Sequence, residues 1–162
     1  MKSVILIRHT KSDWSNMLDD FDRPIRNDRK EDTMLIAKEI AEKGALPQHI
    51  ISSPAVRTLQ TAEILCAEWK YPFKNITRDK SLYECEARDI LTAIKQTDEE
   101  YNVIAIVCHN PAITVFINQY SDASIDNIPT TGAMRIDFDV IHWSDIKAKG
   151  KAKWFIRPKE LR

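Results

Sequence analysis

Short, uninterrupted runs of apolar residues mark the predicted strands of this chain. The clearest runs are residues 4–7 and 103–107, and a shorter one spans residues 50–51. Continuous apolar runs are typical of strands that are buried on both faces, as in a parallel sheet. The place of residues 73–77 between two helical patterns indicates a fourth, weaker strand there.

Apolar residues spaced three and four positions apart predict four helices. The four stripes are Ile36, Ala37, Ile40 and Ala41; Leu59, Ala62, Cys66 and Trp69; Ala87, Ile90, Leu91 and Ile94; and Ile113, Phe116 and Ile117. Gly44 stands where the C-terminus of the first helix favours glycine. The pairs Ser53-Pro54 and Asn110-Pro111 predict the starts of the second and fourth helices, with Ser53 and Asn110 as caps.

The C-terminal part of the chain changes from continuous runs to alternation. Apolar and polar residues alternate around Met134, Ile136, Phe138 and Val140, and again around Ala152, Trp154 and Ile156. This pattern predicts two half-exposed antiparallel strands at the edge of the sheet. Strands and helices alternate over the rest of the chain, which predicts a layered α/β fold. The polar segment 10–26 is the longest irregular stretch, and loops of this length are often functional.

Composition narrows the functional classes. The chain has 162 residues, with 24 Lys and Arg against 24 Asp and Glu, whereas a dedicated nucleic-acid binder usually has a basic excess. No apolar run reaches the roughly 18 residues of a membrane span, and the first run is too short for a signal peptide. The three cysteines lack metal-ligand spacing and indicate free thiols in a reducing compartment. We therefore expect a cytoplasmic protein with neither a nucleic-acid nor a membrane partner.

Polar residues follow three of the predicted strands. The segments are Arg8-His9 after the first, Ser52-Ser53-Pro54 with the nearby Arg57 after the second, and Cys108-His109-Asn110 after the third. A lone histidine at a strand end is usually structural, and an arginine in the first turn of a helix opposes the helix dipole unless an anion lies near. Ligands bind at the carboxyl ends of parallel strands. Two histidines and two arginines at one rim therefore predict an anion pocket with a candidate nucleophile.

Other chemistries fit these residues less well. A zinc site lacks a third ligand at the strand ends, and two arginines would repel the cation, so we expect no metal. Three glycines form neither a GxGxxG nor a GxxxxGK loop, which disfavours nucleotide-binding folds of those types, and no cofactor is expected. No GxSxG elbow is present for a serine hydrolase. Neither Cys85 nor Cys108 lies in a recognisable phosphatase-type loop.

Phosphoryl transfer fits the predicted pocket best. A phosphate monoester carries about two negative charges near neutral pH, and Arg8 and Arg57 can bind its oxygens through paired hydrogen bonds. A neutral His9 can attack phosphorus through its free ring nitrogen. We expect His109 to be protonated and to stabilise the transferring group.

Four motifs occur in order along the chain. They are Leu6-Ile7-Arg8-His9-Thr10, the segment SPAVRTLQTA at residues 53–62, Leu82-Tyr83-Glu84, and Val107-Cys108-His109-Asn110-Pro111. Together they resemble the RHG, SPxxRxxQTA, LxE and HNP segments of the histidine phosphatase superfamily (branch 1). Three further segments are similar to its small SixA-type branch, which includes phosphohistidine phosphatases: RHTKS at residues 8–12, DRP at residues 22–24 and PTTGA at residues 129–133. The resemblance runs from residue 4 to about residue 157.

The resemblance implies a fold and a set of catalytic roles. The fold is a phosphoglycerate mutase-like three-layer α/β/α sandwich, mostly parallel with an antiparallel C-terminal edge, in a single domain of residues 1–162 without a cap insertion. His9 would be the nucleophile, and Arg8, Arg57 and His109 would line the phosphate pocket. Glu84 would be the proton donor, and a helix-initiating carboxylate is an equal alternative for it.

Residues beside these motifs are candidates for substrate contacts. They are Lys11, Ser12, Arg23 and Asn110. The chain departs from the family pattern where Thr10 and Cys108 replace glycines next to the two histidines, and Thr10 is expected to crowd the pocket slightly. Trp14 is expected to be a packing anchor rather than a substrate contact.

These observations predict a metal-independent phosphatase that forms a phosphohistidine on His9 and then hydrolyses it. Its substrate would be a phosphorylated small molecule or a phosphoprotein. A phosphomutase and a catalytically silent phosphate-binding module are the alternatives. Residues 147–162 carry seven Lys and Arg against one Glu, which favours protection of an edge strand over attraction of an acidic phosphoprotein.

Overall fold

A six-stranded sheet forms the centre of the protein, which is described over residues 1–162 by a computed structural model. Its strands are β1 (Lys2–Arg8), β2 (His49–Ser52), β3 (Thr77–Arg78), β4 (Val103–Cys108), β5 (Ala133–Phe138) and β6 (Lys151–Ile156). They lie in the order β3-β2-β4-β1-β5-β6. The first four positions are parallel, whereas β5 runs antiparallel to β1, and β6 antiparallel to β5. The predicted mostly parallel sheet with an antiparallel C-terminal part is confirmed.

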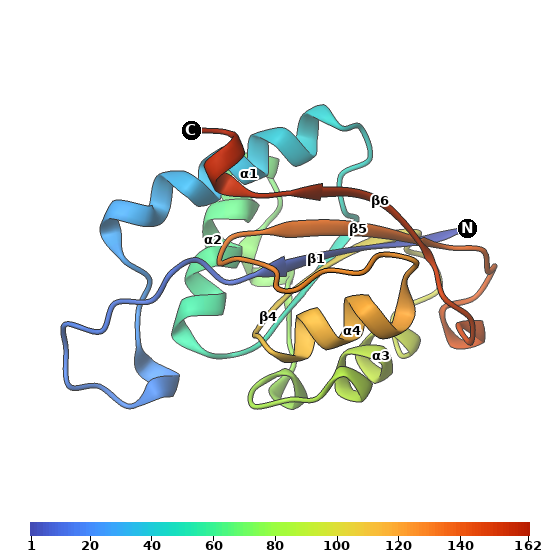
Figure 1. The fold of residues 1–162 in the computed structure, drawn as a ribbon, viewed down its shortest axis with the longest axis horizontal. Coiled ribbons are helices and arrows are strands. Elements are labelled where there is room, and N and C mark those ends of the chain that lie inside the picture. The colour runs from blue at the N-terminus through green and yellow to red at the C-terminus, as the bar shows by residue number, and fades with distance from the viewer.

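Four helices cover the two faces of this sheet (Figure 1). They are α1 (Lys30–Glu42), α2 (Val56–Trp69), α3 (Ala87–Lys95) and α4 (Ala112–Tyr120). Ile5 and Ile7 of β1 are buried in a core with α1 and α2, whereas Val4 and Leu6 are buried in a second core with α3 and α4. Because alternate residues of β1 enter different cores, its apolar run is continuous. The three-layer architecture is therefore as predicted.

The predicted fourth strand and the two antiparallel strands are present, but their bounds or places differ from the prediction. Residues 73–77 do not form a strand, because the N–H of Asn75 bonds to the carbonyl of Pro72 and closes a short 3-10 helix, Phe73–Asn75. Only Thr77–Arg78 then pairs with β2. At the other side, β5 lies between β1 and β6, so β6 alone forms that edge, and Val140 lies beyond the end of β5.

The helix ends agree with the sequence at two of three places. Gly44 follows α1 with a φ of 115°, a left-handed conformation that favours glycine. Asn110 accepts the N–H of Thr114 in the first turn of α4 through its side-chain oxygen, at 3.3 Å. Ser53 is not the cap of α2, because the helix begins after Ala55 and the Ser53 hydroxyl bonds to His109 instead. No helix of the structure is both long and apolar enough to cross a membrane.

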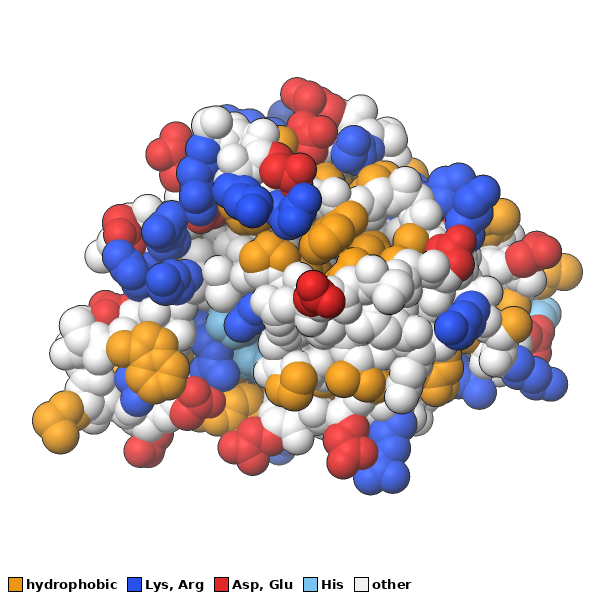
Figure 2. All heavy atoms as spheres, viewed as in Figure 1, with side chains coloured by type: hydrophobic (Ala, Val, Ile, Leu, Met, Phe, Trp, Pro, Cys, Tyr) orange, Lys and Arg blue, Asp and Glu red, His pale blue; other side chains and the backbone are white.

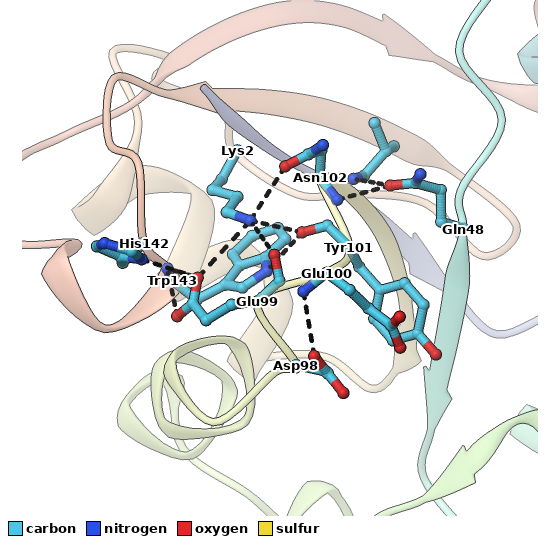
Figure 3. Close-up of polar contacts among 10 residues, drawn as sticks. Lys2, Gln48, Asp98, Glu99, Glu100, Tyr101, Asn102, His142 and Trp143 are labelled. Atoms are coloured by element: carbon cyan, nitrogen blue, oxygen red, sulfur yellow. Dashed lines mark hydrogen bonds and ion pairs between the residues drawn. The ribbon is translucent and has the colours of Figure 1, made fainter.

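A buried lysine ties down the end of the sheet where β1 begins (Figure 3). Lys2 is 2% exposed, and its Nζ donates to the carbonyl oxygens of Glu99 and Tyr101 at 2.9 and 2.7 Å and to Oδ1 of Asn102 at 3.1 Å. The indole of the fully buried Trp143 lies beside this ammonium and donates to the same Tyr101 carbonyl. These bonds join β1 to the segment that leads into β4.

We predict that Lys2→Met lowers the free energy of unfolding by about 1–3 kcal/mol, because a buried acceptor left without a donor loses its hydrogen bond without regaining water. Lys153→Met, at an exposed position of β6, is the matched control and should change stability little. Urea unfolding of both variants measures the difference. Equal effects would show that the Lys2 bonds do not stabilise the sheet.

Candidate active site

The parallel pairing of β1 with β4 brings the two predicted histidines together. Arg8 lies opposite Cys108 in this register, so His9 and His109 leave neighbouring strands at the same end of the sheet. Their ring centroids are 5.3 Å apart. Strand β2 pairs with the other side of β4 and leads to Ser53 and α2. The predicted convergence of these strand ends is confirmed.

His9 is held with one ring nitrogen free. Its Nδ1 lies 2.8 Å from the carbonyl oxygen of Thr10. A carbonyl can only accept, so Nδ1 carries the proton and Nε2 keeps its lone pair. Burial, assisted by the charges of Arg57 and Arg8, lowers the pKa of His9 to about 4, although the bond to Thr10 acts in the opposite direction. His9 is therefore neutral near pH 7 and chemically able to act as a nucleophile.

His109 presents a buried nitrogen that has no partner within the chain. Its Nε2 lies 2.8 Å from the hydroxyl of Ser53, whereas its Nδ1 is buried and makes no hydrogen bond. Burial and the nearby His9 and Arg57 lower the pKa of His109 to about 3. The expectation of a protonated His109 is therefore wrong for the protein without a bound anion, chiefly because burial disfavours the charged ring and His9 and Arg57 add to this effect. A neutral His109 can still serve as a hydrogen-bonding group.

Arg8 lies beside the histidines with unused hydrogen-bonding capacity. Its Nη1 donates to the carbonyl of Ile128 at 2.8 Å, and its Nε is buried without a partner. Desolvation lowers the pKa of this guanidinium below its ordinary value. An anion at Arg8 would satisfy both the unpaired N–H and the desolvated charge.

The segment after Ile128 fixes the backbone of the histidine strand end. Thr131 adopts a left-handed φ of 63°, and its N–H donates to the carbonyls of Arg8 and His9. The Gly132 carbonyl accepts the N–H of Arg8, and a Cβ on Gly132 would lie 2.8 Å from the carbonyl oxygen of Pro129. This close approach leaves no room for a side chain, so glycine is required at residue 132.

Thr10 forms buried hydrogen bonds that connect the strand end to the helices. Its side chain is fully buried, and its hydroxyl bonds to the hydroxyls of Thr33 in α1 and Thr131. Its backbone N–H donates to the hydroxyl of Thr61 in α2. The residue that replaces the family's glycine therefore links the nucleophile segment to two helices.

Arg57 projects from the first turn of α2 toward a carboxylate that sequence analysis did not single out. Its Nη1 donates to the carbonyl of Asp20 at 2.7 Å, and its Nη2 donates to Oδ2 of the same residue at 3.1 Å. Oδ2 also accepts the hydroxyl of Tyr83 at 2.8 Å. Tyr83 lies in the LxE motif, and Asp20 lies in the polar loop of residues 10–26. Nothing in the spacing of Arg57, Asp20 and Tyr83 indicated that Arg57 and Tyr83 would both bond to Asp20.

Glu84 follows Tyr83 at the border of this cluster. Its backbone has a φ of 53°, a left-handed conformation that is uncommon for residues other than glycine. Residues in such conformations often lie at functional sites. Its carboxylate is exposed and makes no hydrogen bond or ion pair within the chain. It is therefore free to move, and it is not the helix-initiating carboxylate, because Glu86 and Asp89 form the capping box of α3.

The four flanking candidates differ in their surroundings. Lys11 is exposed, and Ser12 is buried where it pairs with Ile25 at the base of the long loop. Arg23 stacks its guanidinium 3.8 Å above the ring of Trp14. Trp14 itself is 67% exposed, so the expected packing anchor is wrong. The Asn110 side chain bonds to Asn127 and Thr114, so both its amide nitrogen and its amide oxygen have partners within the protein.

The structure does not support Cys108 as a nucleophile, and it shows no cluster of metal ligands. Cys108 is fully buried, and burial raises the pKa of its thiol well above the ordinary value. Thiols of this kind are poor nucleophiles, since the thiolate is the reactive form. No group of three or more His, Cys, Asp or Glu side chains is arranged to hold a metal ion.

The site opens on one face of the molecule. Figure 2 shows imidazole surface in a recess, with Lys and Arg side chains gathered beside and above it and apolar side chains on the long loop to its left. The apolar residues exposed on this loop are Trp14, Met17, Leu18 and Phe21. A phosphoryl group can therefore reach the two histidines from solvent past cationic side chains.

Comparison with known proteins identifies the family. Residues 4–90, just over half of the chain, match the histidine phosphatase superfamily (branch 1). An uncharacterized chloroplast protein of Arabidopsis thaliana is 30% identical over 133 residues, which are 76% of this chain and 61% of that protein. The chain thus spans less than two thirds of the length of this relative.

Solved structures of low sequence identity share the fold. The protein histidine phosphatase SixA complexed with tungstate has a TM-score of 0.85 at 16% identity, covering 99% of both chains. A putative phosphohistidine phosphatase SixA from Agrobacterium tumefaciens has a TM-score of 0.76 at 24% identity, over 84% of this chain and 91% of that one. A phosphoserine phosphatase mutant from Entamoeba histolytica, bound to phosphoserine, has a TM-score of 0.68 at 16% identity over both full chains. This protein belongs to branch 1 of the histidine phosphatase superfamily and is SixA-like in fold.

Proposed function

We propose that this protein is a phosphatase that hydrolyses a phosphate monoester or a phosphohistidine through a covalent intermediate on His9. The observation that carries the proposal is the state of His9. Its Nδ1–H is held by the Thr10 carbonyl, its Nε2 lone pair is free, and its pKa of about 4 keeps it neutral between two arginines. A neutral imidazole among fixed positive charges is suited to attack a dianion.

The cationic side chains bind and orient the phosphoryl group. Arg8 offers its unpaired Nε–H, Arg57 offers a guanidinium at the start of α2, and the unpaired Nδ1 of His109 offers a further polar contact. In this low-dielectric site these groups act more strongly than in water and need little reorganisation. They place phosphorus next to His9 Nε2.

The first step transfers the phosphoryl group to His9. The Nε2 lone pair forms the P–N bond while the bond from phosphorus to the leaving atom breaks, and the electron pair departs with that atom. Glu84 in its protonated form supplies a proton to an oxygen leaving group and becomes a carboxylate. In the second step water attacks phosphorus and loses a proton to the Glu84 carboxylate, the P–N bond breaks, and inorganic phosphate is released.

Two classes of substrate suit this chemistry. One structural neighbour is named the protein histidine phosphatase SixA and another a putative phosphohistidine phosphatase SixA, and a third is a phosphoserine phosphatase mutant. The leaving groups differ, because a phosphohistidine ring whose other nitrogen is protonated, an event near pH 6.5 for an ordinary imidazole, departs as a neutral molecule, whereas an alkoxide needs a proton from the enzyme. The demand on Glu84 therefore distinguishes the substrates.

His9→Ala should lower kcat by roughly 10³-fold or more, as removal of a nucleophile does, while inorganic phosphate still binds through the arginines. His142→Ala is the matched control, because His142 is exposed and pairs with Glu99 next to the Lys2 cluster (Figure 3). Steady-state kinetics on p-nitrophenyl phosphate and calorimetry with phosphate measure the two effects. Near-normal turnover by His9→Ala would refute nucleophilic catalysis by this residue.

The imidazole rings of His9 and His109 should stay neutral as the pH falls from about 8 to about 5, whereas an ordinary histidine protonates near 6.5. Burial is the main cause, since it lowers both pKa values, to about 4 and about 3. Ring signals followed by NMR, assigned with His9→Gln and His109→Gln, test this. A midpoint near 6.5 for His9 would mean that the nucleophile is not desolvated.

Glu84→Gln should slow hydrolysis of an alkyl phosphate by about 10²–10⁴-fold, because general acid help is worth that much for a poor leaving group. The same change should slow p-nitrophenyl phosphate weakly and a phosphohistidine peptide least. Glu63→Gln, at an exposed position of α2, is the control. If all three substrates slow equally, Glu84 is not the proton donor.

A further inference from the structure

The carboxylate of Asp20 makes the only ion pair of the candidate site. Its partner Arg57 directs both terminal nitrogens, Nη1 and Nη2, to Asp20, the first to the carbonyl and the second to the carboxylate. A guanidinium can use these two nitrogens to donate paired hydrogen bonds to two oxygens of a phosphate. Asp20 thus engages the donors of Arg57 that a phosphoryl group also requires.

Tyr83 connects this carboxylate to the histidines. Its ring lies edge-on to His109 with centroids 5.7 Å apart, and it also lies edge-on to Phe21 with centroids 5.0 Å apart. Its hydroxyl donates to Asp20 Oδ2 at 2.8 Å. Desolvation and this hydrogen bond raise the pKa of Tyr83 to about 12, so the hydroxyl keeps its proton and is a donor.

The position and exposure of Asp20 allow its side chain to move away from Arg57. It begins the 3-10 helix Asp20–Asp22 in the long loop, which is held at its base by the pairing of Ser12 with Ile25. Its side chain is 49% exposed, compared with 10% for Arg57. A half-exposed carboxylate regains water at small cost when it moves outward, whereas the buried guanidinium stays in the site.

We propose that Asp20 competes with phosphate for Arg57, and that its departure frees the Tyr83 hydroxyl to become a further phosphate-binding donor. The inference rests on the proposed function only in that phosphate binds at Arg57. A phosphoryl group with about two negative charges outcompetes one carboxylate and repels it at close range. Arg57 then exchanges a carboxylate for a phosphate, and Tyr83 exchanges Asp20 for a phosphate oxygen.

The competition predicts the sign of each substitution. Asp20→Asn removes the competing charge and should tighten the Kd for inorganic phosphate about three- to fivefold, the range of a partly exposed ion pair. Asp22→Asn removes a charge from the same 3-10 helix, but Arg57 bonds to Asp20 and not to Asp22, so it should change the Kd by less than about twofold through screened solvent. Isothermal titration calorimetry on the full chain measures both.

Tyr83→Phe tests the second half of the proposal. In the Asp20→Asn background it should weaken phosphate binding about tenfold, since it removes one hydrogen bond to a charged group. In the wild type its effect should be smaller, because the same change also removes a bond that holds Asp20 on Arg57. The two substitutions are therefore expected to be non-additive.

Opposite outcomes overturn the inference and leave the phosphatase proposal standing. If phosphate binds but Asp20→Asn weakens it, Asp20 positions Arg57 and does not compete. If Tyr83→Phe has no effect in the Asp20→Asn background, the hydroxyl does not bind phosphate. If neither the wild type nor any variant binds phosphate, this inference and the proposed phosphate pocket both fail.

Discussion

The register between β1 and β4 is the constraint on which the rest of the site depends. Arg8 pairs with Cys108 in this register, and the residues that follow them are the two histidines. A slip by one residue would turn the alternating side chains of β1 to the opposite cores, and Ile5 and Leu6 are both fully buried. Core packing on both faces of β1 therefore fixes the strand register, and this register sets the positions of His9 and His109.

Charge balance is the second organising feature. Arg8 and Arg57 are held near two rings whose pKa values are lowered, so the site has positive charge from guanidinium groups and a neutral nucleophile. Two of its buried nitrogens, Arg8 Nε and His109 Nδ1, have no partner in the chain. A buried polar group without a partner is costly. An anion would satisfy the Arg8 N–H, and it would also satisfy His109 Nδ1 in the tautomer that carries the proton there. Asp20 is the one carboxylate that offsets this charge, which links the long loop to the site.

The sequence predicts those parts of the protein that local patterns encode. Continuous and alternating apolar runs predict the sheet and its two covered faces, and the residues after residues 4–7 and 103–107 predict the paired histidines. Contacts between distant segments could not be predicted in this way. Asp20 bonds to Arg57, 37 residues along the chain, and to Tyr83, 63 residues along, and Ser53 bonds to His109 rather than capping a helix. Each such contact follows from tertiary packing, which no spacing rule captures.

The central claim is that His9 Nε2 becomes covalently phosphorylated during turnover. Rapid quenching of the enzyme with a ³²P-labelled substrate, under alkaline conditions that preserve P–N bonds, tests this claim most directly. The account predicts label on His9, released by mild acid, that disappears as substrate is exhausted and is absent from His9→Ala. Label on Ser12 or Cys108, or steady turnover with no labelled protein after a quench that preserves a phosphohistidine standard, would contradict it.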